Sequence, residues 1–293
     1  MPIFTFCGQR ERSAVAPKSP LRVLYLTSVR DTGTCDRNGT IIATPSGPKY
    51  MEGAIERTIA TTYPGNPLHG IIEVVGIVND DLASDMRTSD YPAAPMAGNP
   101  WIFPSDLCLP TGESAVVITH HIPSDFRALP RHAHAARRER KYQFERRVYE
   151  LFTTLRADLV ISDHYMARID YLINDFGLFG SVLNIHPAVT IEGHPFCFRG
   201  KTPTADAIAR AQSGAPTLTG ATLHIVDAEI DHGPPIAYAA VTPVYPTDEP
   251  QLLRWRNYQT AKLPLLVAGL RHYALHIYPY RSCADLGALT AQR

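Results

Sequence analysis

Short apolar runs recur along the chain at intervals that suit buried strands. Four of them are rich in β-forming residues: 21–28, 71–78, 115–122 and a run that begins at 158. Continuous apolar runs of this length are typical of strands that are covered on both faces, as in parallel sheets. The pattern therefore predicts a sheet that lies inside the protein.

Helical patterns lie between these runs. Residues 49–62 carry apolar side chains at helical spacing, and residues 135–155 predict a long, charged helix. A leucine-rich pattern over 251–276 predicts a helix that is bent or restarted near Pro264. Strands that alternate with helices predict an α/β fold, Rossmann-like, with a mostly parallel twisted sheet and helices on both faces.

The stretch 181–237 combines two strand patterns, a helical pattern and polar residues at the strand ends. Its first strand ends in NIHP, and alternate residues of a strand share a face, so Asn184 and His186 leave the same side. Pro187 has no N–H to donate, so pairing stops there. This end of a strand is where open α/β sheets bind ligands. Asp231 follows in the turn IDHGPP, which can bring a carboxylate to the same edge.

The ordered set of motifs resembles the folate-dependent formyltransferases. It comprises N-x-H-P at 184–187, an R-G turn at 199–200 before an alanine-rich helix, and G-x-T-x-H-x-V-D-x-x-x-D-x-G-P-x-I at 220–236. The resemblance is dense over 158–237 and looser elsewhere. That family includes glycinamide ribonucleotide transformylase, methionyl-tRNA formyltransferase, sugar N-formyltransferases and hydroxyornithine formyltransferase. The resemblance implies a formyltransferase fold, with 10-formyltetrahydrofolate as the co-substrate and an amine as the acceptor.

The resemblance implies that Asn184, His186 and Asp231 are the catalytic residues. Formyl transfer passes through a tetrahedral adduct whose oxygen becomes negative, and an amide N–H and a protonated imidazole can both donate to that oxygen. A carboxylate beside the imidazole would favour its charged form and could take the proton of the attacking amine, through a water. Taken alone, Asn184 could cap a strand and Asp231 could be an ordinary turn residue. The ordered set favours catalysis.

The resemblance also implies two segments that contact the folate. The first matches the family's pterin-contacting turn and comprises Tyr165, Met166, Ala167, Arg168 and Ile169. Ala167 stands where the family often has Arg, so contacts from the backbone are expected there. The second is the turn after the second strand pattern and comprises Val226, Asp227, Ala228 and Glu229.

The likeness divides the chain into three parts. We expect residues 1–20 to be an N-terminal extension or a short edge segment, and residues 21–245 to be the catalytic domain. Residues 246–293 are expected to be a helical segment that packs on the catalytic domain or extends it. That segment could pair two subunits in a homodimer or pack on its own sheet, and the sequence leaves both open.

Charge and loop composition narrow the acceptor. Lys plus Arg and Asp plus Glu each number 28, so no net basic charge favours nucleic acid, and we expect no nucleic-acid partner. The loop 30–48 lacks the compact S-G-x-G-[ST]-N sequence of the purine-pathway enzymes. An amino sugar or an amino-acid-derived metabolite is therefore favoured as the acceptor. We expect this loop and the proline-rich loop 82–112 to recognise it.

Cysteine usage and hydropathy indicate the compartment. The five cysteines form no CxxC pair and leave an odd count, which suits free thiols in the cytoplasm better than a disulfide framework. No apolar run approaches the roughly 20 residues of a membrane helix, and the N-terminus lacks a secretory pattern. We therefore expect a cytoplasmic protein without a membrane partner.

Two other functions remain open at this point. A hydrolase would use water in place of the amine and release formate and tetrahydrofolate. A non-catalytic module would bind folate without turnover, but mere binding does not require a donor pair and a carboxylate. Transfer to an amine is the leading hypothesis because the full catalytic set is present.

The histidines of the chain do not form a metal-ligand pattern. His120 with His121 and His132 with His134 are only close pairs, whereas a zinc site needs three or four converging ligands. We predict that the purified protein contains no stoichiometric metal, as measured by elemental analysis. One zinc ion per chain would contradict this prediction.

Overall fold

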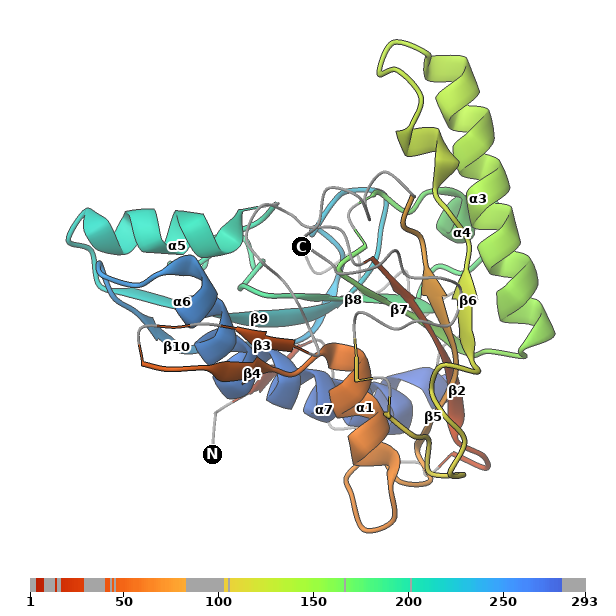
Figure 1. Cartoon of the computed structure of the whole chain (residues 1–293), viewed down its shortest axis with the longest axis horizontal. Coiled ribbons are helices and arrows are strands. Elements are labelled where there is room, and N and C mark those ends of the chain that lie inside the picture. Colours follow the sequence, from red (N-terminus) through yellow and green to blue (C-terminus); the bar gives the residue numbers. More distant parts are fainter. Residues whose placement is uncertain are drawn as a thin grey trace.

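The computed structural model describes residues 4–7, 14, 17–28, 40–42, 44, 46–82, 103–104, 106–165, 167–200 and 202–280. Within these ranges an eight-stranded sheet forms the centre, with strand order β1-β10-β9-β8-β7-β2-β5-β6 (Figure 1). The strands are β1 (Thr5–Phe6), β2 (Leu21–Thr27), β5 (Ile72–Asn79), β6 (Thr119–His121), β7 (Leu159–Asp163), β8 (Val182–His186), β9 (Thr217–Ile225) and β10 (Pro235–Val244). β3 (Thr40–Ile42) and β4 (Lys49–Met51) form a separate antiparallel pair.

The sheet is parallel from β8 to β6 and antiparallel beyond it. β8, β7, β2, β5 and β6 run in one direction, whereas β9, β10 and β1 pair antiparallel with their neighbours. β1 lies within the first 20 residues and is a short edge strand, one of the two possibilities expected for this segment. The parallel strands all end at one edge of the sheet, so the residues that follow β7 and β8 meet there.

Helices cover both faces of the sheet (Figure 1). α1 (Ala54–Thr62) and α7 (Leu263–His272) pack on one apolar cluster, and α3 (His134–Thr154) and α4 (Tyr171–Asn174) pack on the other. β2 divides its side chains between them, because Val23 and Tyr25 join the first cluster while Leu24 and Leu26 join the second. This division explains the continuous apolar run. α5 (Pro203–Gln212) packs on β9 and β10 together with α6 (Pro250–Asn257).

Two of the predicted elements are shorter than expected. The helix predicted over 49–62 begins only at Ala54, because Gly53 is extended (φ −93°, ψ 165°) and residues 49–51 pair as β4. Met51 is buried although it belongs to β4. Its apolar side chain therefore extends the helical pattern of the sequence beyond the start of the helix. The strand predicted over 115–122 is restricted to Thr119–His121, since the chain turns before it and Val117 is 64% exposed.

The C-terminal segment contains an interrupted helix. Pro264 lies in the first turn of α7, and a π-helical turn, η2 (Tyr258–Lys262), joins α6 to α7. A second π-helical turn, η3 (Tyr273–Ile277), follows. Gly269 of α7 lies so close to β9 that a Cβ there would be 2.6 Å from Leu223 Cδ2. This segment therefore packs directly on the sheet, and the α-helix restarts at Leu263, next to Pro264, after the π turn.

Asn257 joins this segment to the end of β8. Its side-chain Nδ2 donates to the carbonyl oxygens of Pro187 (2.9 Å) and Gly220 (2.7 Å), and its Oδ1 accepts from Thr242 Oγ1 (2.9 Å). The backbone that carries Asn184 and His186 is thereby fixed from behind by a helix that lies 70 residues further along the chain. None of the described helices is long and apolar enough to cross a membrane.

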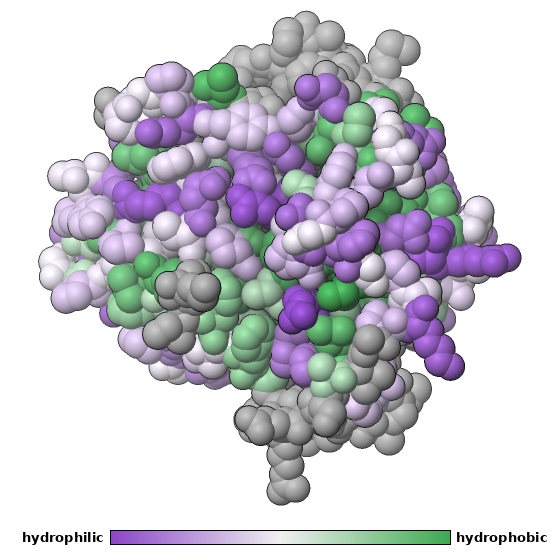
Figure 2. All heavy atoms as spheres, turned by 90° about the horizontal axis from the view of Figure 1, so that it is seen from below, coloured by the Kyte–Doolittle hydropathy of each residue, from purple (hydrophilic) through white to green (hydrophobic). Residues whose placement is uncertain are grey.

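The surface is of mixed character. Figure 2 shows one face on which hydrophilic and hydrophobic side chains are interspersed. The large apolar side chains that are exposed are Phe6, Ile41, Tyr50, Val117, Ile230 and Tyr245. Ile41 and Tyr50 are cross-strand partners in the β3–β4 pair, and the other four lie on separate elements. Single exposed apolar residues of the latter kind are ordinary. Ile230 differs from the others because it precedes Asp231.

A buried ion pair connects β7 to the C-terminal segment. Lys262 Nζ lies 2.7 Å from Asp163 Oδ1, and the two side chains are 1% and 3% exposed. Burial raises the pKa of Asp163, but the charge and hydrogen bond of Lys262 together with His164 outweigh burial, so that the pKa is below its ordinary value. Burial lowers the pKa of Lys262, and Asp163 and Tyr258 more than reverse this. Both groups are therefore charged at neutral pH.

We predict that Lys262→Met destabilises the protein by about 3–5 kcal/mol, because it leaves the Asp163 carboxylate buried without its cation. The double variant Asp163→Asn/Lys262→Met should recover at least half of this loss. Urea unfolding measures both. Arg146→Met is the control, because it breaks an exposed ion pair: the side chains of Arg146 and Glu150 are 47% and 60% exposed. This substitution should destabilise the protein by less than about 1 kcal/mol. Equal costs for the single and double variants would contradict the prediction.

Candidate active site

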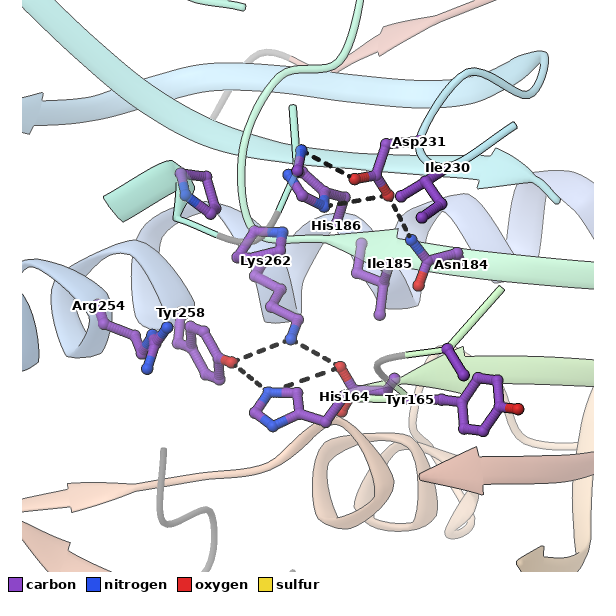
Figure 3. A pocket seen from close by; sticks show the side chains of 15 residues that line it. His164, Tyr165, Asn184, Ile185, His186, Ile230, Asp231, Arg254, Tyr258 and Lys262 are labelled. Carbon is purple, nitrogen blue, oxygen red and sulfur yellow. Dashed lines mark hydrogen bonds and ion pairs between the residues drawn. The ribbon is translucent and has the colours of Figure 1, made fainter. Parts of the chain in front are cut away.

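Three predicted catalytic side chains converge at the carboxyl end of β8 (Figure 3). Asn184 and His186 belong to β8, and Asp231 lies in the turn between β9 and β10. His186 Nδ1 is 3.3 Å from Asp231 Oδ1, and Asn184 Nδ2 is 3.4 Å from the same oxygen. The structure thus places a carboxamide, an imidazole and a carboxylate around one point, as the spacing of the motifs requires.

His186 is held between two hydrogen-bond acceptors. Its Nε2 lies 3.0 Å from the carbonyl oxygen of Phe198, and its Nδ1 faces the Asp231 carboxylate. The side chain is 7% exposed. These two contacts fix the plane of the imidazole at the end of β8.

Asp231 adopts a backbone conformation that is uncommon for a residue with a side chain. Its φ is +59°, in the left-handed region, and its Oδ2 accepts the backbone N–H of Gly200 at 3.1 Å. Burial raises the pKa of Asp231, but the hydrogen bond and the charge of His186 outweigh burial, so that the pKa lies below its ordinary value. Residues held in such conformations cluster at functional sites.

His224 is a fourth member of this cluster that the sequence reasoning missed. It is the direct partner of Asn184 in the antiparallel register of β8 and β9. Its Nδ1 is 3.0 Å from the carbonyl oxygen of Ile225, so Nδ1 carries the hydrogen and Nε2 accepts from Asn184 Nδ2 at 3.0 Å. Burial is the main cause of its lowered pKa, which leaves it neutral. His224 therefore orients the amide of Asn184.

Two pockets open on either side of the catalytic residues. The larger encloses about 790 Å³ of open space, and the smaller about 390 Å³. Asn184, Asp231 and Ile230 line both, so the reacting group of a ligand in one pocket can approach a ligand in the other. Ile230, 55% exposed, offers an apolar contact at this junction.

The smaller pocket gathers most of the residues predicted to contact the folate. Seven of the nine line it: Tyr165, Ala167, Arg168, Ile169, Val226, Asp227 and Glu229. Ala228 lies in the same turn but does not line the pocket, and Met166 lies outside the described residues. Asp227 Oδ1 accepts the backbone N–H of Glu229 at 3.0 Å, which shapes this turn. The two predicted segments therefore form one surface.

The larger pocket contains a second polar cluster that the sequence reasoning also missed. Lys262 Nζ donates to Asp163 Oδ1 (2.7 Å) and to Tyr258 Oη (3.0 Å), and Tyr258 Oη is 2.7 Å from His164 Nε2. Burial lowers the pKa of His164 to about 4, so this imidazole is neutral. His164 has a φ of +61° and directly follows β7. In Figure 3 this cluster lies across the pocket from Asn184 and Asp231.

The described residues contain no group of three or more His, Cys, Asp or Glu side chains that could hold a metal ion. Most of the two long loops expected to recognise the acceptor, including residues 29–39 and 83–102, lie outside the described ranges. Their role stays a prediction.

Comparison with known proteins gives the following similarities. A sequence model of the formyl transferase family matches residues 117–266. Phosphoribosylglycinamide formyltransferase of Mycobacterium tuberculosis is 36% identical over 120 residues, which is 41% of this chain and 50% of that protein. The chain thus spans about half the length of the curated relatives it matches.

Solved structures share the fold over most of the chain. PvdF of pyoverdin biosynthesis, described as a structurally unique N10-formyltetrahydrofolate-dependent formyltransferase, has a TM-score of 0.75 and 27% identity, covering 87% of this chain and 99% of that one. A formyltetrahydrofolate deformylase of Burkholderia mallei has a TM-score of 0.54 and 20% identity, covering 87% of this chain and 65% of that one. The predicted fold class is confirmed by these similarities.

We predict that Gly233→Ala disturbs the catalytic turn. A Cβ at this position would lie 1.7 Å from the backbone oxygen of Ile225, so the turn must move, at a cost of about 1–3 kcal/mol. Asp231 is two residues away, and a displacement of about 1 Å lowers turnover on the order of a hundredfold. Thermal unfolding and tetrahydrofolate release measure the two effects.

Gly112→Ala is the matched control. Gly112 has a φ of +84° and nothing within 4 Å of an added Cβ, so its substitution should cost roughly 1–2 kcal/mol through backbone strain alone. Turnover should be retained. If Gly233→Ala has native turnover as well, the close approach of the turn to Ile225 does not position Asp231.

Proposed function

The chain belongs to the formyl transferase family, and we propose that it transfers the formyl group of 10-formyltetrahydrofolate to an amine of a small-molecule acceptor. The family model covers 150 of the 293 residues, and these include Asn184, His186 and Asp231. The single observation that carries the proposal is the convergence of these three side chains between two pockets. One pocket would hold the folate and the other the amine.

The chemistry assigns a step to each residue. The amine nitrogen attacks the formyl carbon and forms a C–N bond, which gives an adduct with a negative oxygen and a protonated nitrogen. Asp231 takes the proton from that nitrogen, through a water. The negative oxygen then re-forms the C=O bond as the bond from carbon to N10 breaks, and the same proton passes to N10. The amide of Asn184 donates to the negative oxygen, and a protonated His186 would stabilise the same charge.

The hydrogen bonds of Asn184 fit this role. Its Nδ2 has two hydrogens, of which one is directed to His224 at 3.0 Å and the other to Asp231 at the longer distance of 3.4 Å. The longer bond is the weaker one, so this hydrogen can bond a formyl oxygen placed beside Asp231 without rotation of the amide. His224 would keep the amide in the required orientation throughout. It acts as a positioning residue.

The lining of the larger pocket and the charge balance of the chain support a small acceptor. The pocket combines apolar side chains with a few polar and charged groups, as small-molecule sites do, and the balance of 28 cationic and 28 anionic residues gives no attraction to RNA. The likeness to PvdF of pyoverdin biosynthesis also favours a small molecule. We propose an amino sugar or an amino-acid-derived metabolite as the acceptor. Glycinamide ribonucleotide is the acceptor to test against it, because of the likeness to phosphoribosylglycinamide formyltransferase.

We also propose that the protein works in the cytoplasm. Among the described residues, Cys7, Cys108 and Cys197 are free thiols, which suits a reducing compartment.

One assay separates transfer from the other functions. The protein is incubated with 10-formyltetrahydrofolate, with and without a panel of amines, and the release of tetrahydrofolate is followed. Release that depends on an amine supports transfer. Release without an amine supports hydrolysis, which the fold shared with the deformylase makes the second function to test. Binding without release supports a folate-binding module.

We predict that Asn184→Ala, His186→Ala and Asp231→Ala each lower amine-dependent turnover at least about a hundredfold. Each variant should remain folded, as judged by circular dichroism and thermal unfolding. Thr153→Ala, at the exposed end of α3, is the control and should have native turnover. A variant of any of the three residues that turns over at nearly the native rate would refute the role assigned to that residue.

A further inference from the structure

The wall of the larger pocket opposite the catalytic residues is built on the π-helical turn Tyr258–Lys262. Arg254, Tyr258 and Lys262 line the pocket at intervals of four residues. Four residues of an α-helix overshoot one turn by about 40° each time, so a row with this spacing would drift round the helix. The π turn reduces this drift and keeps Lys262 at the pocket. Such turns often lie at functional sites.

Lys262 has hydrogen-bonding capacity directed at this pocket. An ammonium group has three N–H donors, and those of Lys262 supply Asp163 and Tyr258 at 2.7 Å and 3.0 Å. Within the described part of the chain, this leaves one donor on a side chain that lines the pocket. This ammonium is buried and is also fixed in position, because its two partners are held by regular structure: Asp163 is on β7 and Tyr258 is on the same π-helical turn as Lys262. A fixed, charged donor is suited to bind an anionic oxygen.

The groups next to Lys262 influence whether the pocket favours an anionic or a cationic ligand. His164, which also lines the pocket, is neutral because of its lowered pKa and cannot oppose an anion or attract one by charge. On this wall, the Lys262 ammonium is paired with Asp163 and Tyr258 and keeps one N–H donor for a ligand. Charge-assisted hydrogen bonds of this kind are strongest to an anionic oxygen. A ligand with an anionic end is therefore favoured at the Lys262 wall, with its amine toward Asp231.

We propose that Lys262, held in place by Asp163 and Tyr258, binds an anionic oxygen group of the amine acceptor, a carboxylate or a phosphate. This inference rests on the proposed function and deepens it, since it assigns the larger pocket to the acceptor and states a chemical requirement for it. Lys262 is then a specificity-determining residue. It fixes one end of the acceptor so that the amine at the other end lies next to the formyl carbon.

The requirement has a measurable consequence. An amine that lacks the anionic group loses a charge-assisted hydrogen bond, which lowers kcat/KM about 10- to 100-fold. The loss should fall mainly on KM, because the contact lies away from the reacting atoms. If Lys262 had a purely structural role, its substitution would instead lower kcat/KM equally for amines with and without the anionic group.

Two matched pairs of acceptors test the proposal. N5-hydroxyornithine and N-hydroxyputrescine differ only by a carboxylate, and glycinamide ribonucleotide and glycinamide riboside differ only by a phosphate. For each compound, tetrahydrofolate release gives kcat and KM, and calorimetric titration gives the dissociation constant. The pair that shows the larger preference for its anionic member identifies which of the two anions the site takes.

The variants are chosen so that folding does not decide the result. The double variant Asp163→Asn/Lys262→Met removes the ammonium without leaving a buried charge, and Tyr258→Phe removes one of the two groups that hold it. The double variant should bind both members of the preferred pair with dissociation constants within about threefold of one another, whereas Tyr258→Phe should keep part of the preference. Arg256→Met is the control, because Arg256 is on the same helix but pairs with Asp248 outside the pocket. It should retain the full preference.

Failure of this inference can be told apart from failure of the proposed function. If no amine increases tetrahydrofolate release, the proposed function fails, while the binding constants still test the role of Lys262. If release depends on an amine but both members of each pair are used equally well, the inference fails and the function stands. Retention of the full preference by the double variant, or no binding of any of the four compounds, also overturns the inference.

Discussion

The contact between His186 and Asp231 joins the end of β8 to the turn that follows β9, and the active site depends on it. A carboxylate that is 8% exposed is costly to bury unless it is paired and hydrogen-bonded. His186 supplies the pairing, and the N–H of Gly200 supplies a second hydrogen bond. His186 is satisfied in turn by Phe198, so three chain segments meet around one carboxylate: the end of β8, residues 198–200 and the turn after β9. The same arrangement keeps the carboxylate next to the imidazole at the place where a formyl carbon would be attacked.

The rest of the fold supports this contact from behind. Asn257, on the C-terminal segment, holds the backbone oxygens of Pro187 and Gly220, so that β8 and β9 keep their positions under the site. The π turn next to Asn257 brings Lys262 to Asp163 at the end of β7. The helical C-terminal segment therefore contributes to both walls of the larger pocket. The π turn reduces the rotation between these side chains, since an uninterrupted α-helix would place Lys262 about 40° further round the helix than Tyr258.

Much of the parallel half of the sheet, and the shared face of Asn184 and His186, could be predicted from the sequence because both depend on local periodicity. The catalytic role of Asn184, His186 and Asp231 comes from the resemblance to the family and stays a prediction. Asn184 and His186 share a face through the two-residue repeat of a strand, and the turn with Asp231 is marked by glycine and proline. His224 could not be found in this way, because its role depends on the antiparallel register that pairs it with Asn184. Lys262 was missed for a related reason: a lysine in a helical pattern indicates a surface position, and only the packing on β7 shows it buried with Asp163.

The most direct test of the central claim follows the formyl carbon itself. The protein is given 10-formyltetrahydrofolate that carries a ¹³C label in the formyl group, together with an accepted amine, and the products are identified by mass spectrometry and NMR. The account predicts that the label appears in an N-formyl amide of the acceptor, in an amount equal to the tetrahydrofolate released, and that Asp231→Asn abolishes this transfer. Label recovered as formate, with the amine unchanged, would contradict it.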